Sequence, residues 1–140
     1  MSASGKQSWF GLAILIGFLY AFIGVVFALP SHQIRVWRFA AWVISAAVYA
    51  AHIGYEHFRK RNSPGSTALH VAMAVGIGAF GIAVSALVHS FFVTPNYPRS
   101  RLLLALVLWP VITGVPAFMV AWVATAIMAR LPGKRLAGIE

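Results

Sequence analysis

The chain has 140 residues, of which 61% are hydrophobic and only 9% are charged. A water-soluble domain of this length needs more polar surface, and the apolar residues form several long runs, so a soluble domain on a single anchor is excluded as well. The net charge of +9 comes from short basic clusters at the ends of these runs. Anionic lipid headgroups attract such clusters, so the charge predicts contact with a bilayer rather than with nucleic acid.

The residue types that are missing exclude several kinds of chemistry. There is no cysteine, which removes thiol redox chemistry, disulfides and thiolate metal sites. The only acidic side chains are those of Glu56 and Glu140, and there is no Asp. Two-carboxylate glycosidase chemistry, carboxylate-rich di-iron sites and Asp-containing triads therefore cannot be built. We expect no catalytic residues, and an enzyme is the less favoured interpretation.

Apolar runs predict four transmembrane helices in one all-α domain over residues 1–140. The short connections between the runs favour an antiparallel four-helix bundle. The first run is longer than the roughly 7 to 15 residues of a signal-peptide core, which favours a permanent span. A cleavable signal ending near Ala28 is the alternative. The predicted spans are about 9–29, 36–58, 68–92 and 102–128.

The connections and prolines indicate how the last two helices begin and bend. Segment 59–65 combines charge with a Pro-Gly turn and ends the second span, so we expect Ser66 or Thr67 to cap the third helix. Pro110 and Pro116 lie inside the fourth span. Each proline removes one helical hydrogen bond, which predicts a kink in the fourth helix.

The distribution of basic residues predicts the orientation of the chain in the membrane. Positive charge is greater on the side that holds both termini and the 59–67 loop, so these segments are predicted to be cytoplasmic. The residues counted on that side are Lys6, Arg59, Lys60, Arg61, Arg130, Lys134 and Arg135, and those on the other side are Arg35, Arg38, Arg99 and Arg101.

A line of polar side chains runs along one face of the second span. Their spacing of three or four residues keeps them on one side of a helix. Because a polar or charged group that faces lipid is costly, we expect this face to turn toward other helices or a wet cavity. The line consists of Arg38, Trp42, Ser45, Tyr49, His52 and Glu56.

Two interpretations of this polar line stay open. In the first, its side chains fasten the second helix to its neighbours by hydrogen bonds. In the second, they line a partly hydrated path or pocket, with Arg38 and Glu56 as its oppositely charged ends. His52 would then exchange protons, because an imidazole titrates near neutral pH.

The third span supplies a candidate opposite wall. His70, Ser85 and His89 recur there at helical spacing, with small residues between them. Close helix packing is the plainer explanation of the small residues. Ser85 and His89 are four apart and so close enough to touch, which is the minimum for an activated serine. However, neither an oxyanion-hole motif nor a third orienting acid accompanies them.

A histidine-based metal or haem site is a further hypothesis. We predict no cofactor, and a metal or haem is left open. His52, Glu56 and His70 are weak candidate metal ligands, because an antiparallel hairpin places His70 near the depth of Glu56. The helical zinc motifs do not match, since His57 points about 100° away from Glu56.

The function expected from the sequence is that of a small channel or transporter-like protein. Its second and third helices would enclose a polar cavity for an ion, proton or small solute. The alternative is a non-catalytic accessory or scaffold subunit of a larger membrane complex, and a metal or haem membrane protein is the third. The expected partners are the lipid bilayer and either further copies of the chain or a larger membrane complex, without nucleic acid.

Overall fold

The computed structural model describes residues 4–29, 32–93 and 98–130, and within these ranges the protein is all-helical. Each long helix is long and apolar enough to cross a membrane, which fits a multi-pass membrane protein. The predicted basic tail with Lys134 and Arg135 lies outside the described residues. The elements are α1 (Ser4–Val26), α2 (Ile34–Gly54), the π-helix η1 (Tyr55–Arg59), α3 (Pro64–Val93) and α4 (Arg99–Arg130).

The start of α3 differs from its predicted position. The helix begins at Pro64, and the backbone N–H of Ser66 donates to the side-chain oxygen of Ser63 at 3.3 Å. The cap is therefore Ser63, and the prediction of Ser66 or Thr67 is wrong. A proline at the first helical position explains the earlier start, because its fixed φ suits a helix and its missing N–H has no helical partner to lose there.

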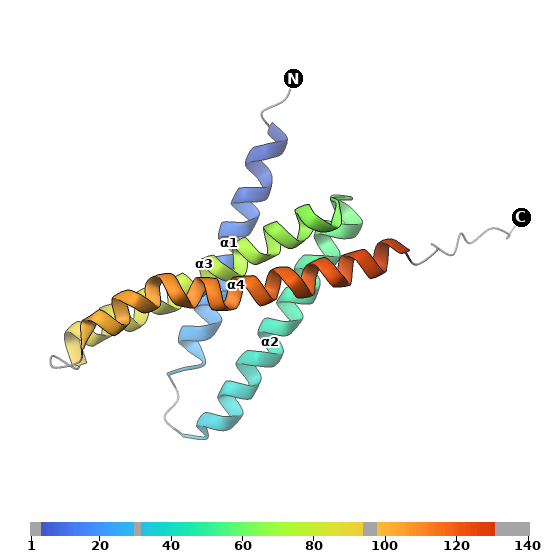
Figure 1. Cartoon of the computed structure of the whole chain (residues 1–140). Coiled ribbons are helices and arrows are strands. Elements are labelled where there is room, and N and C mark those ends of the chain that lie inside the picture. Colours follow the sequence, from blue (N-terminus) through green and yellow to red (C-terminus); the bar gives the residue numbers. More distant parts are fainter. Residues whose placement is uncertain (1–3, 30–31, 94–97, 131–140) are drawn as a thin grey trace, which may run out of the picture.

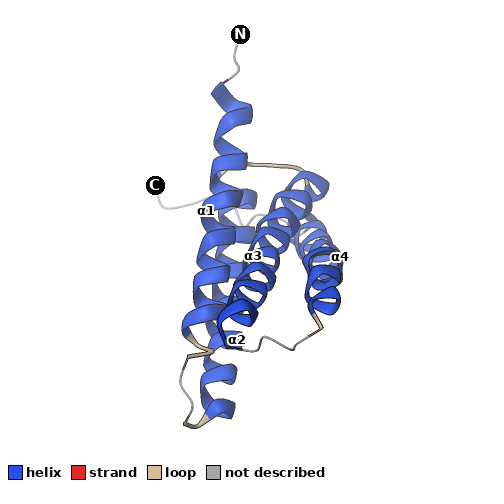
Figure 2. Ribbon diagram, turned by 90° about the vertical axis from the view of Figure 1, so that its left-hand side faces the viewer, coloured by secondary structure: helices blue, strands red, loops and turns tan. Residues whose placement is uncertain are grey.

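α3 is the central helix of the fold (Figures 1 and 2). It runs antiparallel to α4, as the approach of Gly76 to Pro110 and of Ala72 to Gly114 shows. It also packs against α1. α4 continues unbroken through both of its prolines (Figure 1). The arrangement leaves α2 as the helix with the least contact to the other three.

α2 joins the rest of the protein mainly through its C-terminal end. A hydrophobic core forms there from Ile53 of α2, from Ala68 and Val71 of α3 and from Ala121 of α4. Toward its N-terminal end α2 diverges from α3 and α4 (Figure 1), and the Trp42 side chain is 79% exposed. The four helices are therefore closed at one end and open along the outer half of α2.

Glycine allows α1 and α3 to approach closely. A Cβ atom added at Gly17 would lie 2.5 Å from Cγ2 of Ile77 and 3.1 Å from the carbonyl oxygen of Ala74. One added at Gly78 would lie 2.5 Å from Cβ of Tyr20. Backbone atoms and atoms next to the backbone cannot rotate away, so the two helices would have to separate to make room. The small residues on these faces of α1 and α3 thus serve close packing.

The glycine contacts give a first testable prediction. Gly17→Ala and Gly78→Ala are each expected to lower the free energy of unfolding by about 1–2 kcal/mol, because overpacking costs more than the roughly 1 kcal/mol that alanine adds as a helix former. Loss of helical circular dichroism with denaturant in detergent micelles measures this free energy. Gly11→Ala is the control on the same helix, since its added Cβ meets nothing within 4 Å. Equal stability of all three variants would contradict the packing described.

Candidate functional site

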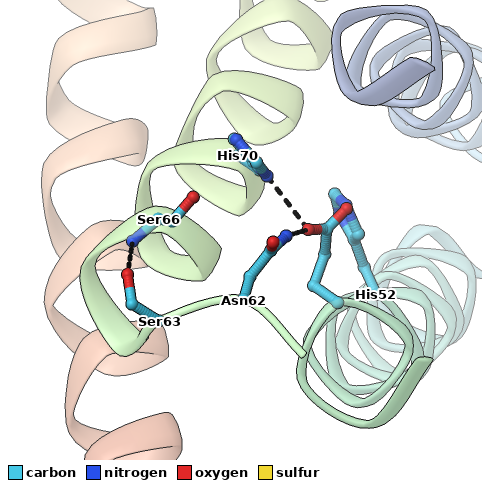
Figure 3. A network of polar contacts seen from close by, with 6 residues as sticks. His52, Asn62, Ser63, Ser66 and His70 are labelled. Atoms are coloured by element: carbon cyan, nitrogen blue, oxygen red, sulfur yellow. Dashed lines mark hydrogen bonds and ion pairs between the residues drawn. The ribbon is translucent and has the colours of Figure 1, made fainter. Parts of the chain in front are cut away.

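The candidate site is centred on Glu56, a residue that is 0% exposed. Its Oε2 atom accepts a hydrogen bond from the side-chain amide of Asn62 and lies 2.9 Å from Nδ1 of His70 (Figure 3). Its Oε1 atom lies 4.0 Å from Nε2 of His52. A buried carboxylate destabilises a protein unless it is paired and hydrogen-bonded. We call these residues, His52, Glu56, Asn62 and His70, the Glu56 cluster.

The chain that follows α2 explains how Glu56 reaches Asn62. From Tyr55 the helix widens into η1, and the N–H of Lys60 donates to the carbonyl oxygen of Tyr55 at 3.3 Å, five residues back. Arg61 then adopts a left-handed conformation with φ 52°, which turns the chain back on itself. As a result, the backbone N–H of Asn62 donates to the carbonyl oxygen of Glu56 at 3.3 Å, beside the side-chain contact.

These backbone features are unusual in themselves. π-helical turns are rare, and this one extends α2 at its C-terminal end. A residue other than glycine in the left-handed region carries a conformational cost that the surrounding structure has to offset. Both features occur within the segment 55–61, directly beside the buried carboxylate. The local backbone therefore favours the contacts of Glu56 over regular helix geometry.

α1 and α3 enclose the site from the other side. His70 is buried on α3, and the ring of Trp9 from α1 stacks on its imidazole with centroids 4.4 Å apart and planes 9° from parallel. Thr67, one turn before His70, is fully buried, and its hydroxyl has no hydrogen-bond partner among the described residues. Three helices and one loop thus shield the Glu56 carboxylate from its surroundings.

One side of the Glu56 cluster is not fully hydrogen-bonded. Within the described ranges, Glu56 Oε1 and both ring nitrogens of His52 are buried without a hydrogen-bond partner. Nε2 of His52 and Oε1 of Glu56 are 4.0 Å apart, which is longer than a hydrogen bond. A small rotation of the imidazole ring or one bridging water would connect these two atoms. Oε2 of Glu56 is therefore held by Asn62 and His70, whereas Oε1 has no hydrogen-bond partner on the His52 side.

The inner half of the predicted polar line faces other helices. His52 and Glu56 are buried, and Ser45 is half-buried. The hydroxyl of Tyr49 donates to the carbonyl oxygen of Ala117 on α4 at 2.5 Å. These contacts join α2 to both α3 and α4, as the polar face was expected to do.

The outer half of the line departs from the prediction. Arg38 and Trp42 are exposed rather than turned toward another helix of this chain, because α2 diverges from α3 and α4 at their level. A polar path enclosed by this chain from Arg38 to Glu56 is therefore not formed. Arg38 and Trp42 are thus not packed against another helix of this chain, although Trp42 lines an open cavity.

The other candidates on α3 lie apart from the Glu56 cluster. Ser85 is half-buried, and His89 is exposed. No hydrogen bond joins Ser85 to His89 in the described structure, so an activated serine is not assembled there.

The metal hypothesis was placed on His52, Glu56 and His70. In the part of the chain that the structure describes, no group of three or more His, Asp or Glu side chains is arranged to hold a metal ion. At 2.9 Å, Nδ1 of His70 and Oε2 of Glu56 are at hydrogen-bonding distance from each other. His70 and Glu56 are therefore in direct contact, whereas Nε2 of His52 lies 4.0 Å from Oε1 of Glu56, beyond hydrogen-bonding distance.

Sequence reasoning missed the contributions of Asn62 and Trp9. Asn62 lies in a polar, basic loop and carries no sequence signal for contact with a helix six residues earlier. The contact depends on the π-helical turn and on the left-handed Arg61, which a propensity argument does not foresee. The stacking of Trp9 on His70 depends on the packing of α1 against α3.

Comparison of the chain with protein-family models, with curated proteins and with solved structures found no match.

Proposed function

We propose that the protein is a multi-pass membrane protein that moves protons, alone or together with an ion or small solute, through the Glu56 cluster. The observation that carries the proposal is the fully buried carboxyl group of Glu56 between His52 of α2 and His70 of α3. An ionisable side chain inside a membrane-spanning helix is costly, and such residues commonly mark proton or ion pathways.

Each member of the cluster has a distinct part in this proposal. Imidazole groups exchange protons near neutral pH, and one imidazole faces each oxygen of the Glu56 carboxyl group. A proton shared with His52 can therefore be exchanged for one shared with His70. Asn62 holds Oε2 in place and keeps the carboxyl group oriented between the two rings.

The incomplete hydrogen bonding supports proton exchange over a purely structural role. A polar cluster that only fastens two helices is most stable when every buried donor and acceptor is paired. Here His52 and Oε1 of Glu56 face each other without a hydrogen bond. This arrangement suits a group that changes partners during a transport cycle.

A different observation favours the accessory-subunit alternative. The outer half of α2, with Arg38 and Trp42, is exposed and has little contact with the other helices of this chain. A second copy of the chain or a larger membrane complex would cover this surface, and the Glu56 cluster would then only fasten α2 to α3. Proton flux through the isolated protein distinguishes the two functions.

Membrane insertion with a cytoplasmic 59–67 loop is also part of the proposal, and the absence of cysteine makes it testable. Gly65→Cys and Ser100→Cys each introduce a single exposed thiol, near opposite ends of α3. In intact cells, a membrane-impermeant maleimide is expected to label only Ser100→Cys, and Gly65→Cys should need permeabilisation. The opposite pattern would reverse the orientation, and labelling of both in intact cells would show that α3 does not cross the membrane.

The central functional prediction concerns proton flux. In liposomes under an imposed pH gradient, the wild-type protein is expected to conduct protons above the level of empty liposomes. Glu56→Gln keeps the bulk and polarity of the side chain but abolishes titration. It should reduce the flux on the order of 100-fold, the scale on which loss of a proton-transfer group slows a reaction. A pH-sensitive dye inside the liposomes measures the flux, and His70→Gln should reduce it as well.

Two variants serve as matched controls for this measurement. Glu140→Gln removes the other acidic side chain, and His32→Gln removes an exposed histidine outside the cluster. Both should conduct like the wild type. Undiminished flux in a folded Glu56→Gln variant would place the pathway elsewhere, and absence of flux from the wild type would favour the accessory-subunit function.

A further inference from the structure

The imidazole of His70 is the titratable group of the Glu56 cluster that has the most contact with its surroundings. Its side chain is 10% exposed, against 1% for each of Glu56 and His52. It lies six residues after Pro64, the first residue of α3, which places it about 9 Å along the helix axis from the start of the helix. Of the three titratable side chains, His70 is therefore the one that the surroundings reach.

The ring of Trp9 fixes the plane of this imidazole. The two rings stack with their centroids 4.4 Å apart and their planes 9° from parallel. A histidine ring otherwise turns easily about its Cβ–Cγ bond, because this torsion has broad minima. Turning it here would drive the imidazole into the indole, since α1 is held against α3 by the close approach at Gly17 and Gly78. The ring therefore stays in the plane that directs Nδ1 at Oε2 of Glu56, 2.9 Å away.

This orientation matters for proton exchange, because the two ring nitrogens of His70 have different surroundings. Nδ1 is occupied by Glu56, so exchange with the surroundings falls to Nε2. When Nε2 takes up a proton, Nδ1 releases its own proton to Oε2, and the carboxylate becomes a carboxylic acid beside a neutral imidazole. Release follows the same steps in reverse. If the ring turned, Nδ1 would leave Oε2 and no hydrogen bond would carry the proton.

Anchoring in the membrane interface is the plainer explanation of Trp9. Tryptophan is enriched at both interfaces of membrane proteins, because its ring has an apolar body and a polar edge. Anchoring needs no particular neighbour, whereas here the indole lies flat on the imidazole that is at hydrogen-bonding distance from Glu56. The stacking geometry therefore favours a role in orienting His70.

We propose that Trp9 is a positioning residue for proton transfer between His70 and Glu56. Its indole keeps Nδ1 of the imidazole aimed at the carboxyl group and leaves Nε2 to exchange protons with the surroundings. Trp9 has no ionisable group, so it takes part in the transfer only through His70. The inference deepens the proposed function and rests on it.

Proton flux in liposomes tests this role with variants of the full-length protein. Trp9→Leu and Trp9→Met keep an apolar side chain without a flat ring. Each should lower the flux about 10-fold, less than the roughly 100-fold expected for loss of a proton-transfer group. Trp9→Phe restores an aromatic face and should conduct close to the wild type. Trp122→Leu is the matched control and should conduct like the wild type, because Trp122 is 46% exposed and, within the described ranges, stacks on no histidine.

A double-mutant cycle with His70→Gln separates positioning from a general effect on the fold. It is measured with enough protein in each liposome for the residual flux of His70→Gln to exceed that of empty liposomes. If Trp9 acts through His70, the double variant Trp9→Leu/His70→Gln should conduct as much as His70→Gln alone. A further 10-fold loss in the double variant, or equal flux of Trp9→Phe and Trp9→Leu, would overturn the positioning role.

The same measurements distinguish failure of this inference from failure of the proposed function. Flux that is lost in Glu56→Gln but is unchanged in Trp9→Leu and Trp9→Met would overturn the role of Trp9 alone. Absence of flux from the wild type would overturn both.

Discussion

A carboxyl group withdrawn from water inside an apolar helix requires partners in fixed positions, and this requirement shapes one end of the protein. Glu56 finds its partners in Asn62, which follows it by six residues, and in His70 on the next helix. The π-helical turn and the left-handed Arg61 make the first contact, and the pairing of α2 with α3 makes the second. The cost of burying a carboxyl group without partners thus favours the way in which α2 meets α3.

A second constraint, the close approach of α1 to α3, acts along the rest of the bundle. Gly17 and Gly78 leave no room for a side chain between these helices, so α1 and α3 form a rigid unit to which α4 adds from the other side. α2 is fixed at its inner end by the Glu56 cluster and by Tyr49, and its outer half is open. This difference leaves a closed polar cluster at one end and an open apolar cavity beyond it.

The four long apolar helices and the burial of the His52–Glu56 face followed from sequence, because apolar length and polar periodicity are local patterns. Antiparallel pairing of the second and third spans also predicted that His70 lies at the level of Glu56 in the membrane. The structure places the two side chains in contact. The exposure of Arg38 and Trp42 did not follow, since periodicity defines a face of α2 but not how far its neighbours extend along it. The sequence analysis overlooked Ser63 as the cap of α3, although Ser-Pro is a recognisable helix start. The contact of Asn62 with Glu56 was not predictable in this way, because it depends on tertiary structure.

Infrared difference spectroscopy at varied pH is the most direct test of the proposed proton exchange at the carboxyl group of Glu56. The chain has only two acidic side chains, Glu56 and Glu140, so a carboxyl band can be assigned with two variants. We expect a protonated-carboxyl band in reconstituted wild-type protein that changes with pH, persists in Glu140→Gln and is lost in Glu56→Gln. If no pH-dependent band depends on Glu56, its protonation state is fixed, and the cluster serves only to hold α2 against α3.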